Sequence, residues 1–430
     1  MDILDAAYIA VSGLAGAVGR GLRRGLPQAV SVRLDAKAPP DPAPGWVWLH
    51  AVSVGELMLA AGLLGRLRDS GSRVHVTTGT PAGLGLLESR LPAWDTGTGR
   101  VTGGGFPFDD LAGLSGFLQT PPGAFVALET EIWPNLYMQL DARKIPICVV
   151  NGRLTEKTAG SAFRPFLRRA ASRLSLVAAR DPESAARFRA LGAPNVVMCG
   201  NLKADLPPPA ELHGEWETLR SAWRGSPVLV AGNTVEGEEE IVFAAWQSAK
   251  ETHPDLRLVI APRQPKRFGQ VAAWLGTAGA KFRTASLALH GDAPGDVQDW
   301  RVANVLLLDT MGELASAYGL GHAAIVGGGW RFRGGHNPLE PLRWGVPAIL
   351  GPHFSNFEDI VLPLLESSPG ALRVVEEGDL PGAIVALLAE CGRDNKRGHA
   401  ASAIELPPQL QNALGKTWES LEPFLKGSRQ

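Results

Sequence analysis

Short apolar runs alternate with longer stretches of helical periodicity along most of the chain, and this alternation constrains the fold more than any other feature. In the first half, such runs include Trp46–His50, Val74–Thr78 and Phe125–Leu128. A buried strand is an unbroken apolar run, and a parallel strand needs a crossover segment, usually a helix, before its neighbour begins. The alternation therefore predicts an α/β fold built from βα units with a mostly parallel sheet.

A proline-rich segment divides the pattern into two series. After Asp205 the sequence continues Leu-Pro-Pro-Pro, which favours a stiff, extended linker, and a second series begins at Pro227. We therefore expect an N-terminal domain over residues 39–205, a linker over 206–226 and a C-terminal domain over 227–430, with the last helix able to cross back to the first domain. Two doubly wound sheets should face each other across a cleft, with ligands beyond the carboxyl ends of the strands.

Composition and charge exclude several classes of protein. The chain has 430 residues, and its 42 basic and 43 acidic side chains give a formal net charge of −1, which provides no global field for a nucleic-acid partner. Its three cysteines, Cys148, Cys199 and Cys391, form no CxxC pair, so we expect neither a disulfide scaffold nor a cysteine-built zinc site. No HExxH motif or His/Cys cluster follows a predicted strand, so we expect no catalytic metal.

Residues 1–38 form a separate N-terminal segment. Apolar residues dominate Ile3–Gly19, and Arg20, Arg23 and Arg24 follow at once. A signal peptide has its positive charges before the apolar part, and no apolar run here is long enough to predict a transmembrane helix. The observed order suits a helix lying on a membrane surface with its cations near anionic lipids. An ordinary amphipathic helix packed on the protein is the alternative.

Carboxylates stand directly after two predicted strands. Ser53 and Glu56 have the spacing of a capping box, in which the glutamate satisfies a backbone N–H, but the same carboxylate could accept a proton from a hydroxyl nucleophile. Glu129 and Glu131 follow Phe125–Leu128, and two carboxylates at a buried strand end need cations or amides nearby. This acidic pair is a candidate site. The alternative is a structural ion pair with a nearby cation, Arg153 or Lys203.

The glycine-rich segment 327–341 indicates a nucleotide site in the second half. Its glycines let the backbone approach a ligand, Asn337 suits a helix N-cap, and Pro338 suits the first helical position. The start of a helix attracts phosphate, and Glu340, one turn later, could accept hydrogen bonds from ribose hydroxyls. No Walker lysine and no early GxGxxG motif is present, which disfavours an ATPase or a dehydrogenase.

Taken in order, the motifs of this chain resemble those of the 3-deoxy-D-manno-octulosonic acid (Kdo) transferase family over almost its whole length. The segments that carry the resemblance are HAVSVGE (50–56), ETEIWPN (129–135), NGRLT (151–155), NLK (201–203), EGEE (236–239), APR (261–263), DTMGE (309–313), GGHNPLEP (334–341) and GPH (351–353). The resemblance implies a GT-B glycosyltransferase with two Rossmann-like domains and an N-terminal membrane-associated helix, located at the cytoplasmic face of the inner membrane. It implies inverting transfer of Kdo from CMP-Kdo to a lipid A precursor, without a metal or cofactor.

The resemblance also implies roles for individual residues. Glu56 matches the general base of the family, and Glu129 and Lys203 match residues that stabilise the transition state. The positions that match the CMP site are Pro262, Arg263, Met311, Gly312, Glu313, Asn337, Pro338, Leu339 and Glu340.

Several positions depart from the family pattern. Val235 and Gln264 replace two family histidines, Gly329 replaces a serine, and Ala204 replaces a phenylalanine. These departures bear on donor affinity, on contacts near the phosphate and on the number of Kdo units added, more than on the class of reaction. The alternatives are a GT-B transferase or epimerase acting on another nucleotide sugar, and a non-catalytic, membrane-bound nucleotide-binding scaffold.

Overall fold

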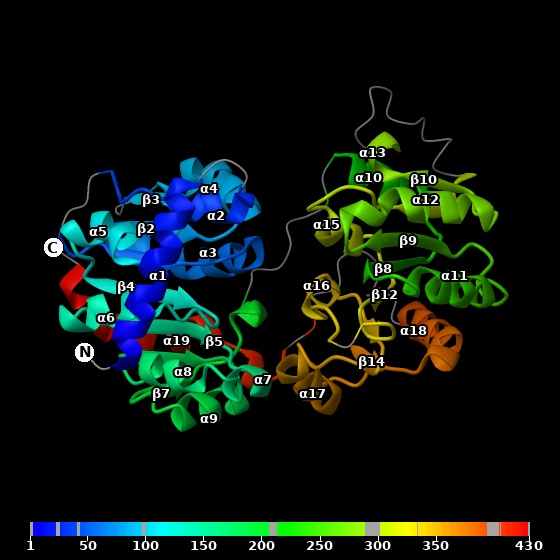
Figure 1. The fold of residues 1–430 in the computed structure, drawn as a ribbon. Coiled ribbons are helices and arrows are strands. Elements are labelled where there is room, and N and C mark those ends of the chain that lie inside the picture. Colours follow the sequence, from blue (N-terminus) through cyan, green and yellow to red (C-terminus); the bar gives the residue numbers. More distant parts are fainter. Residues whose placement is uncertain are drawn as a thin grey trace. The chain divides into compact units, whose positions relative to one another are not determined.

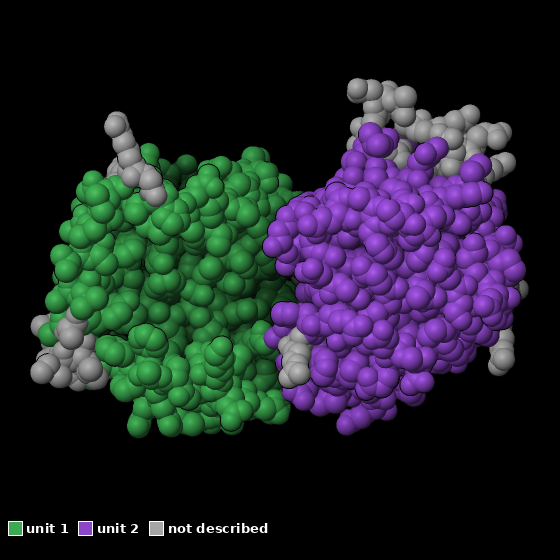
Figure 2. Space-filling model, turned by 45° about the vertical axis from the view of Figure 1, so that its right-hand side comes forward, with its two compact units in different colours: residues 1–206, 410–430 green, residues 207–409 purple. Residues whose placement is uncertain are grey.

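The computed structural model describes residues 3–22, 26–40, 44–96, 100–205, 212, 214–288, 302–332, 334–393, 404 and 406–428. The chain divides into unit 1, residues 1–206 with 410–430, and unit 2, residues 207–409 (Figures 1 and 2). Part of the segment expected to be a linker is helical, because α10 (Glu215–Ala222) forms there and buries Trp216 and Leu219. The chain therefore enters unit 2 before Pro227, and its last residues belong to unit 1.

Unit 1 contains a seven-stranded parallel sheet in the order β3-β2-β1-β4-β5-β6-β7. Its strands are β1 (Val47–His50), β2 (Val74–Thr78), β3 (Val101–Gly105), β4 (Ala124–Leu128), β5 (Ile147–Gly152), β6 (Leu176–Ala179) and β7 (Val196–Met198). The parallel sheet expected from the apolar runs is confirmed. Strand order reverses between β1 and β4, and such a switch point is where α/β sheets bind ligands.

Helices cover both faces of this sheet, as expected for strands that are apolar on both sides. One apolar layer lies under α3, α4 and α19, and the other lies under α5, α6, α8 and α9. The helices of unit 1 are α1 (Ile3–Gly21), α2 (Gln28–Leu34), α3 (Val54–Asp69), α4 (Pro81–Trp94), α5 (Leu111–Gln119), α6 (Pro134–Ala142), α7 (Glu156–Ala159), α8 (Arg164–Ala171), α9 (Pro182–Ala190), α19 (Ala413–Leu421) and the 3-10 helices η1 (Leu202–Asp205) and η5 (Glu422–Ser428).

Unit 2 contains a second seven-stranded parallel sheet, in the order β10-β11-β9-β8-β12-β13-β14, with its switch point at β8. Its strands are β8 (Val228–Thr234), β9 (Arg257–Pro262), β10 (Phe282–Thr284), β11 (Val305–Leu307), β12 (Ala323–Val326), β13 (Ala348–Leu350) and β14 (Leu372–Val374). After α10, its helices are α11 (Glu238–Ala249), η2 (Pro265–Arg267), α12 (Phe268–Thr277), α13 (Ala285–Ala288), α15 (Leu314–Tyr318), α16 (Leu339–Leu342), α17 (Glu358–Ser367), η3 (Glu377–Asp379) and α18 (Leu380–Arg393), and η4 (Pro408–Leu410) follows at its end.

One strand in each sheet ends in a bulge centred on an asparagine. Asn151 in β5 has φ 52° and Asn233 in β8 has φ 57°, and the pairing register of each strand shifts at that residue. Asparagine tolerates this left-handed conformation better than most residues, and a bulge changes the direction in which the following residues leave the sheet. Both bulges lie close to the candidate site residues described below.

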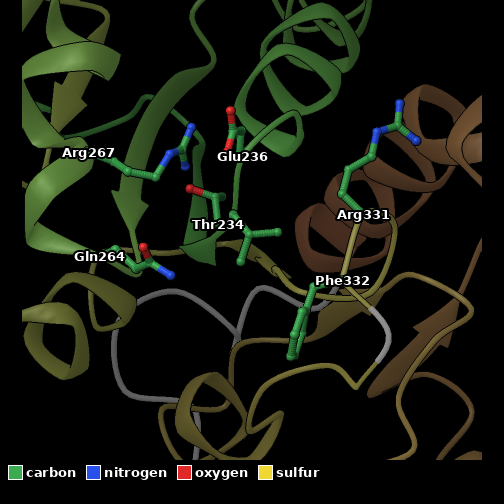
Figure 3. A pocket seen from close by; sticks show the side chains of 7 residues that line it. Thr234, Glu236, Gln264, Arg267, Arg331 and Phe332 are labelled. Atoms are coloured by element: carbon green, nitrogen blue, oxygen red, sulfur yellow. The ribbon is translucent and has the colours of Figure 1, made fainter.

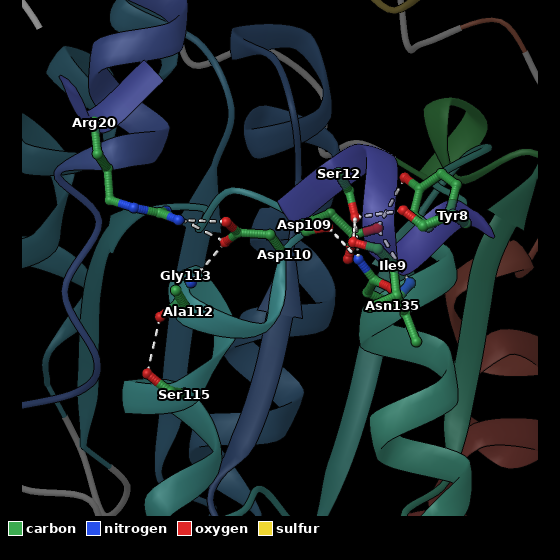
Figure 4. A network of polar contacts seen from close by, with 10 residues as sticks. All are labelled: Tyr8, Ile9, Ser12, Arg20, Asp109, Asp110, Ala112, Gly113, Ser115 and Asn135. Carbon is green, nitrogen blue, oxygen red and sulfur yellow. Dashed lines mark hydrogen bonds and ion pairs between the residues drawn. The ribbon is translucent and has the colours of Figure 1, made fainter. Parts of the chain in front are cut away.

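The first helix, α1, packs beside α5 and α6 and is held to unit 1 by polar side chains (Figures 1 and 4). Its Tyr8 hydroxyl donates a hydrogen bond to Asp109 at 3.1 Å, and Asn135 Nδ2 donates to Ser12 Oγ at 2.8 Å. Ion pairs fix both ends of the helix: Asp5 with Arg169 at 3.0 Å and Arg173 at 2.9 Å, and Arg20 with Asp110 at 2.6 Å. The helix therefore turns its polar side toward the protein.

The opposite side of α1 and the turn after it carry an exposed apolar stripe, defined by Val11, Leu14, Val18 and Leu22. These side chains are 70%, 69%, 49% and 62% exposed, and their spacing of three and four residues places them on one helical face. Arg23 and Arg24, expected near lipid headgroups, lie outside the described residues. Within the described parts of the chain, no helix is long and apolar enough to span a membrane.

Candidate functional site

Three carboxylates gather at the switch point of the first sheet. Glu56 lies in the first turn of α3, directly after β1, whereas Glu129 and Glu131 follow β4, the strand beside it. Both of the latter act electrostatically on Glu56. The structure therefore brings together the acidic residues that the sequence placed at two separate strand ends.

Glu56 takes part in a variant of the capping box that its spacing predicted, in which its carboxylate bonds to the N–H of Val52 rather than to that of the N-cap residue Ser53. Its carboxylate accepts hydrogen bonds from the Val52 N–H at 2.8 Å and the Ser53 hydroxyl at 3.2 Å, and Ser53 Oγ accepts from the Glu56 N–H at 3.4 Å. The pKa of Glu56 is raised to about 7, chiefly by burial and also by the negative charges of Glu129 and Glu131, while the Val52 and Ser53 hydrogen bonds oppose the rise. A carboxyl group with a pKa near neutrality suits proton transfer at physiological pH.

Glu129 is paired with Lys203. The distance from Lys203 Nζ to Glu129 Oε1 is 3.8 Å, and the two side chains are 26% and 24% exposed. Glu129 has φ 56°, which is uncommon for a glutamate and is a form of backbone strain found mostly at functional sites. The ion pair left open by the sequence is thus formed with Lys203, while both groups stay accessible to a ligand.

Two asparagines that sequence reasoning did not assign hold the Lys203 loop. Asn151 Oδ1 accepts the Leu202 N–H at 2.9 Å, and Asn201 Oδ1 accepts the Lys203 N–H at 3.0 Å. Both asparagines occur in the motifs of the sequence, and asparagine at a strand end is typical of a side chain that bonds to nearby backbone. That residue preference was the signal available for them.

His50 and Arg33 also interact with Glu131, and no local sequence pattern predicted either contact. His50 is fully buried at the end of β1, and its Nε2 lies 3.7 Å from Glu131 Oε2. The Arg33 guanidinium lies 4.2 Å from the centre of the Trp133 ring and interacts electrostatically with Asp109 and Glu131. Arg33 comes from α2, so only the folded chain brings it to this site.

Unit 2 has a pocket of about 460 Å³ at its own switch point (Figure 3). The loops after β8, β9 and β12 line it with Thr234, Val235, Glu236, Gln264, Arg267, Arg331 and Phe332. The two positions at which this chain lacks a family histidine, Val235 and Gln264, therefore line one pocket. The volume is within the range of small-molecule sites.

A buried ion pair stiffens one wall of this pocket. Arg267 forms two hydrogen bonds with the buried Glu239 carboxylate, at 2.6 and 3.0 Å, and the Thr234 hydroxyl donates to the same carboxylate at 2.8 Å. On another wall, Arg331 pairs with Glu377 at 2.8 Å, with both side chains nearly half exposed. An exposed pair of this kind is weak, so Arg331 can exchange its partner for a ligand anion.

The carboxylate of Glu238, the first residue of α11, bonds to backbone N–H groups in the first part of the glycine-rich loop. Glu238 is fully buried and accepts the N–H groups of Gly328 at 2.7 Å, Trp330 at 3.0 Å and Arg331 at 3.3 Å. These amides are therefore already bonded within the protein. A Cβ at Gly329 would lie 2.7 Å from the Gly351 nitrogen, so the backbone contact between the two loops explains why glycine stands at position 329.

The remaining donor-site candidates of this loop lie around α16. This helix begins at Leu339, one residue later than expected, with Pro338 at its N-cap, and Asn337 Oδ1 accepts the Leu339 N–H at 3.2 Å. Glu340 is in its first turn. Burial, assisted by the positive charge of Arg263, lowers the pKa of His336 to about 4, which places Arg263 electrostatically beside this segment.

The other donor-site candidates follow β9 and β11. Pro262 is the buried last residue of β9, and Arg263 after it is exposed. Met311 is 64% exposed and Gly312 has φ 87°, while the Thr310 hydroxyl donates to the Glu313 carboxylate. Glu313 is itself the N-cap residue of α15, so the contact between Thr310 and Glu313 forms a turn before the helix.

In the parts of the chain that the structure describes, no group of three or more His, Cys, Asp or Glu side chains is arranged to hold a metal ion.

Comparison with known proteins gives consistent results over nearly the full length of the chain. Residues 23–206 match the family model described as 3-deoxy-D-manno-octulosonic-acid transferase (kdotransferase). The 3-deoxy-D-manno-octulosonic acid transferase of Haemophilus influenzae is 33% identical over 394 residues, which cover 90% of this chain and 88% of that protein. The protein of the same description from Bordetella pertussis is 33% identical over 404 residues, covering 91% and 90%.

A solved structure gives the same fold with little sequence similarity. The UDP-GlcNAc 2-epimerase of Neisseria meningitidis, bound to UDP-GlcNAc, matches with a TM-score of 0.56 at 13% identity, over 88% of this chain and 99% of that one. At this identity the similarity concerns the fold alone: two parallel α/β units of the kind found in GT-B proteins.

Proposed function

Because the chain belongs to the 3-deoxy-D-manno-octulosonic acid (Kdo) transferase family, whose members are glycosyltransferases, we propose that it transfers Kdo from CMP-Kdo to a lipid A precursor. The proposed reaction inverts the anomeric carbon and uses neither metal nor cofactor. The observation that carries the proposal is the switch point of the first sheet, where Glu56, with a pKa of about 7, lies beside Glu129 and Glu131.

In the proposed mechanism Glu56 is the general base. An acceptor hydroxyl attacks the anomeric carbon of Kdo while Glu56 takes its proton, and the bond from that carbon to the CMP phosphate breaks. A carboxylate with a pKa near the working pH is ionised in a large fraction of molecules and remains basic enough to accept a proton. The hydrogen bonds from Val52 and Ser53 hold it in place before the reaction.

Glu129 and Lys203 are proposed to act on the transition state. Positive charge develops at the sugar carbon as the donor bond breaks, and a fixed carboxylate nearby stabilises it. Lys203, 3.8 Å from Glu129, holds that carboxylate and offers a cation to the acidic sugar. The strained backbone of Glu129 is consistent with a side chain fixed for this purpose.

The proposed donor site lies at the strand ends of unit 2. Because Glu238 already occupies the amides of Gly328, Trp330 and Arg331, the CMP phosphate depends on Arg263 for its main positive charge. Glu340 is proposed to bond to the ribose, and the pocket of about 460 Å³ beside Gln264 offers space for the sugar. The other proposed donor contacts are Pro262, Met311, Gly312, Glu313, Asn337, Pro338 and Leu339.

We propose that the acceptor is reached at the cytoplasmic face of the inner membrane. The apolar stripe of α1 supports this, because exposed apolar residues on one helical face favour binding at a lipid surface. The polar contacts on the other face of α1 would keep the membrane-facing side attached to the domain that carries Glu56.

The test is an assay of the purified full-length protein with CMP-Kdo and a tetraacylated lipid A precursor, followed by lipid mass. We expect a mass increase of one or more Kdo units. Glu56→Gln should lower the rate by about 10²–10⁴-fold, because the base is lost, while the circular dichroism spectrum is unchanged. The control is Glu183→Gln, at an exposed position in the first turn of α9.

Three results would contradict parts of the proposal. Consumption of another sugar nucleotide, such as UDP-GlcNAc, without any change in lipid mass would show that the substrates are wrong. Equal activity of Glu56→Gln and the unaltered protein would remove Glu56 as the base. Strong inhibition by a chelator would contradict the metal-free reaction.

A further inference from the structure

His50 and Glu131 form a pair beside the proposed base that the mechanism above leaves unused. Nδ1 of the fully buried His50 lies 3.1 Å from both the carbonyl oxygen and the hydroxyl oxygen of Thr77. Because the carbonyl oxygen can only accept, this position favours a hydrogen on Nδ1. Nε2 then faces Glu131 Oε2 at 3.7 Å and has no hydrogen-bond partner among the described residues. The geometry thus aims an unsatisfied ring nitrogen at a carboxylate.

This arrangement is unfavourable unless a proton lies between the two groups. A neutral imidazole with its hydrogen on Nδ1 presents a lone pair at Nε2, and an ionised carboxylate presents only lone pairs. Two acceptors repel each other, and a buried polar atom without a partner costs free energy. One added proton, on Nε2 or on Oε2, turns the contact into a charge-assisted hydrogen bond once the Glu131 side chain rotates slightly to close the gap.

The two cations that the structure shows near Glu131 also interact with other acids. Arg33 faces it, but its single charge also faces Asp109, and Lys203 is paired with Glu129. The Tyr137 hydroxyl and the Glu56 carboxyl also interact electrostatically with Glu131. His50, whose other charged neighbour is Arg33, is therefore the group on which a compensating proton can be held.

We propose that His50 and Glu131 share one proton taken up from solvent, and that this proton shields the base Glu56 from the charge of Glu131. With the proton present the pair has no net charge, so Glu131 adds little repulsion to the ionised form of Glu56. Without it, Glu131 would add a full negative charge at the site. Burial alone disfavours the imidazolium form of His50 by lowering its pKa, and the contact with Glu131 opposes that shift.

A direct test uses the free protein and no substrate, so it does not depend on the proposed activity. Full-length protein labelled with ¹⁵N-histidine is titrated between pH 6 and 8, and the His50 signals are assigned from their loss in His50→Gln. We expect the Nε2 resonance of His50 to have the shift of a protonated or proton-sharing nitrogen, and to move to that of an unprotonated nitrogen in Glu131→Gln. An unprotonated Nε2 in both proteins would overturn the proposal.

The second test rests on the proposed role of Glu56 and follows the acidic limb of the pH profile of kcat/KM for transfer. Because the pair is already neutral, Glu131→Gln should leave the midpoint of this limb unchanged. His50→Gln should raise it, so that activity falls at least fivefold at pH 6 and recovers at pH 8.5. The double variant should have the midpoint of Glu131→Gln.

A merely structural effect is distinguishable from this outcome. It would lower activity by a similar factor at every pH, and the control His75→Gln, at another buried histidine one strand away that bonds to Thr102, should behave in that way. A lower midpoint in Glu131→Gln would mean that Glu131 is fully charged in the unaltered protein, which would overturn the shared proton. If His50→Gln fails to fold, the Glu131→Gln profile still decides the question.

Discussion

At Glu56, the helix-capping contacts and the proposed role as base concern the same side chain, although the sequence left them as alternatives. Its backbone N–H bonds to Ser53 Oγ as in a capping box, and its carboxylate accepts the Val52 N–H and the Ser53 hydroxyl. The same carboxylate is buried and close enough to two other acids for its pKa to rise to about 7. A cap on the surface would not have this property, so burial rather than the capping pattern favours Glu56 as a proton acceptor.

This pKa predicts the pH dependence of the proposed transfer. The base must be ionised, and a raised carboxyl pKa means that protonation begins at a higher pH than usual, so kcat/KM should rise with pH and level off above about pH 7. The measurement is initial rates between pH 5 and 9. Ser53→Ala removes a hydrogen bond that stabilises the ionised form, so the midpoint should move upward. A profile that is flat from pH 5 to 8 would contradict Glu56 as the base.

At the scale of elements, what the sequence could predict depends on how local each interaction is. Apolar runs such as Phe125–Leu128 predicted the parallel strands, because burial on both faces leaves a direct mark on the sequence. The contact between His50 and Glu131 joins the end of β1 to the loop after β4, and Arg33 reaches that site from α2. No local pattern encodes these contacts. The start of α16, displaced by one residue, shows that helix ends are also loosely specified.

Helix α1 supports a prediction at this scale. Val11→Ser with Leu14→Ser removes two of the most exposed members of its apolar stripe and leaves the polar contacts of Tyr8 and Arg20 in place. Each lost side chain weakens burial in a lipid surface by about 1.5–3 kcal/mol, so partitioning to vesicles should fall by about tenfold or more. The measurement is co-sedimentation with vesicles containing anionic lipid.

The matched control for this change lies in the other unit. Leu287→Ser alters a side chain of α13 that is 71% exposed, as open to solvent as those of the stripe. It should sediment with vesicles to the same extent as the unaltered protein. Equal binding of the α1 double variant and this control would show that the stripe does not contact lipid.

At the scale of the whole molecule, the last residues of the chain complete the first unit. Leu421 of α19 and Leu425 of η5 are fully buried in the layer that contains Leu57 and Leu63 of α3, and the Leu414 N–H bonds to Asp205. Unit 1 therefore combines residues from both ends of the sequence. Its core cannot be completed until unit 2 has been synthesised, because residues 207–409 separate the two parts.

This arrangement predicts that a change near the C-terminus destabilises the N-terminal unit. Leu421→Ala leaves a cavity under α3, and such a change costs about 2–5 kcal/mol of the free energy of unfolding. Because a two-unit chain need not unfold in one step, the measurement is amide hydrogen exchange read separately in each unit. Protection of β1 and α3 should fall while that of β8 and α11 is retained.

The control, Leu362→Ala on α17, alters a side chain that is 45% exposed and should change protection in neither unit. Equal loss in both units after Leu421→Ala would mean that the two units unfold together, and unchanged protection of α3 would mean that α19 adds little to the core of unit 1.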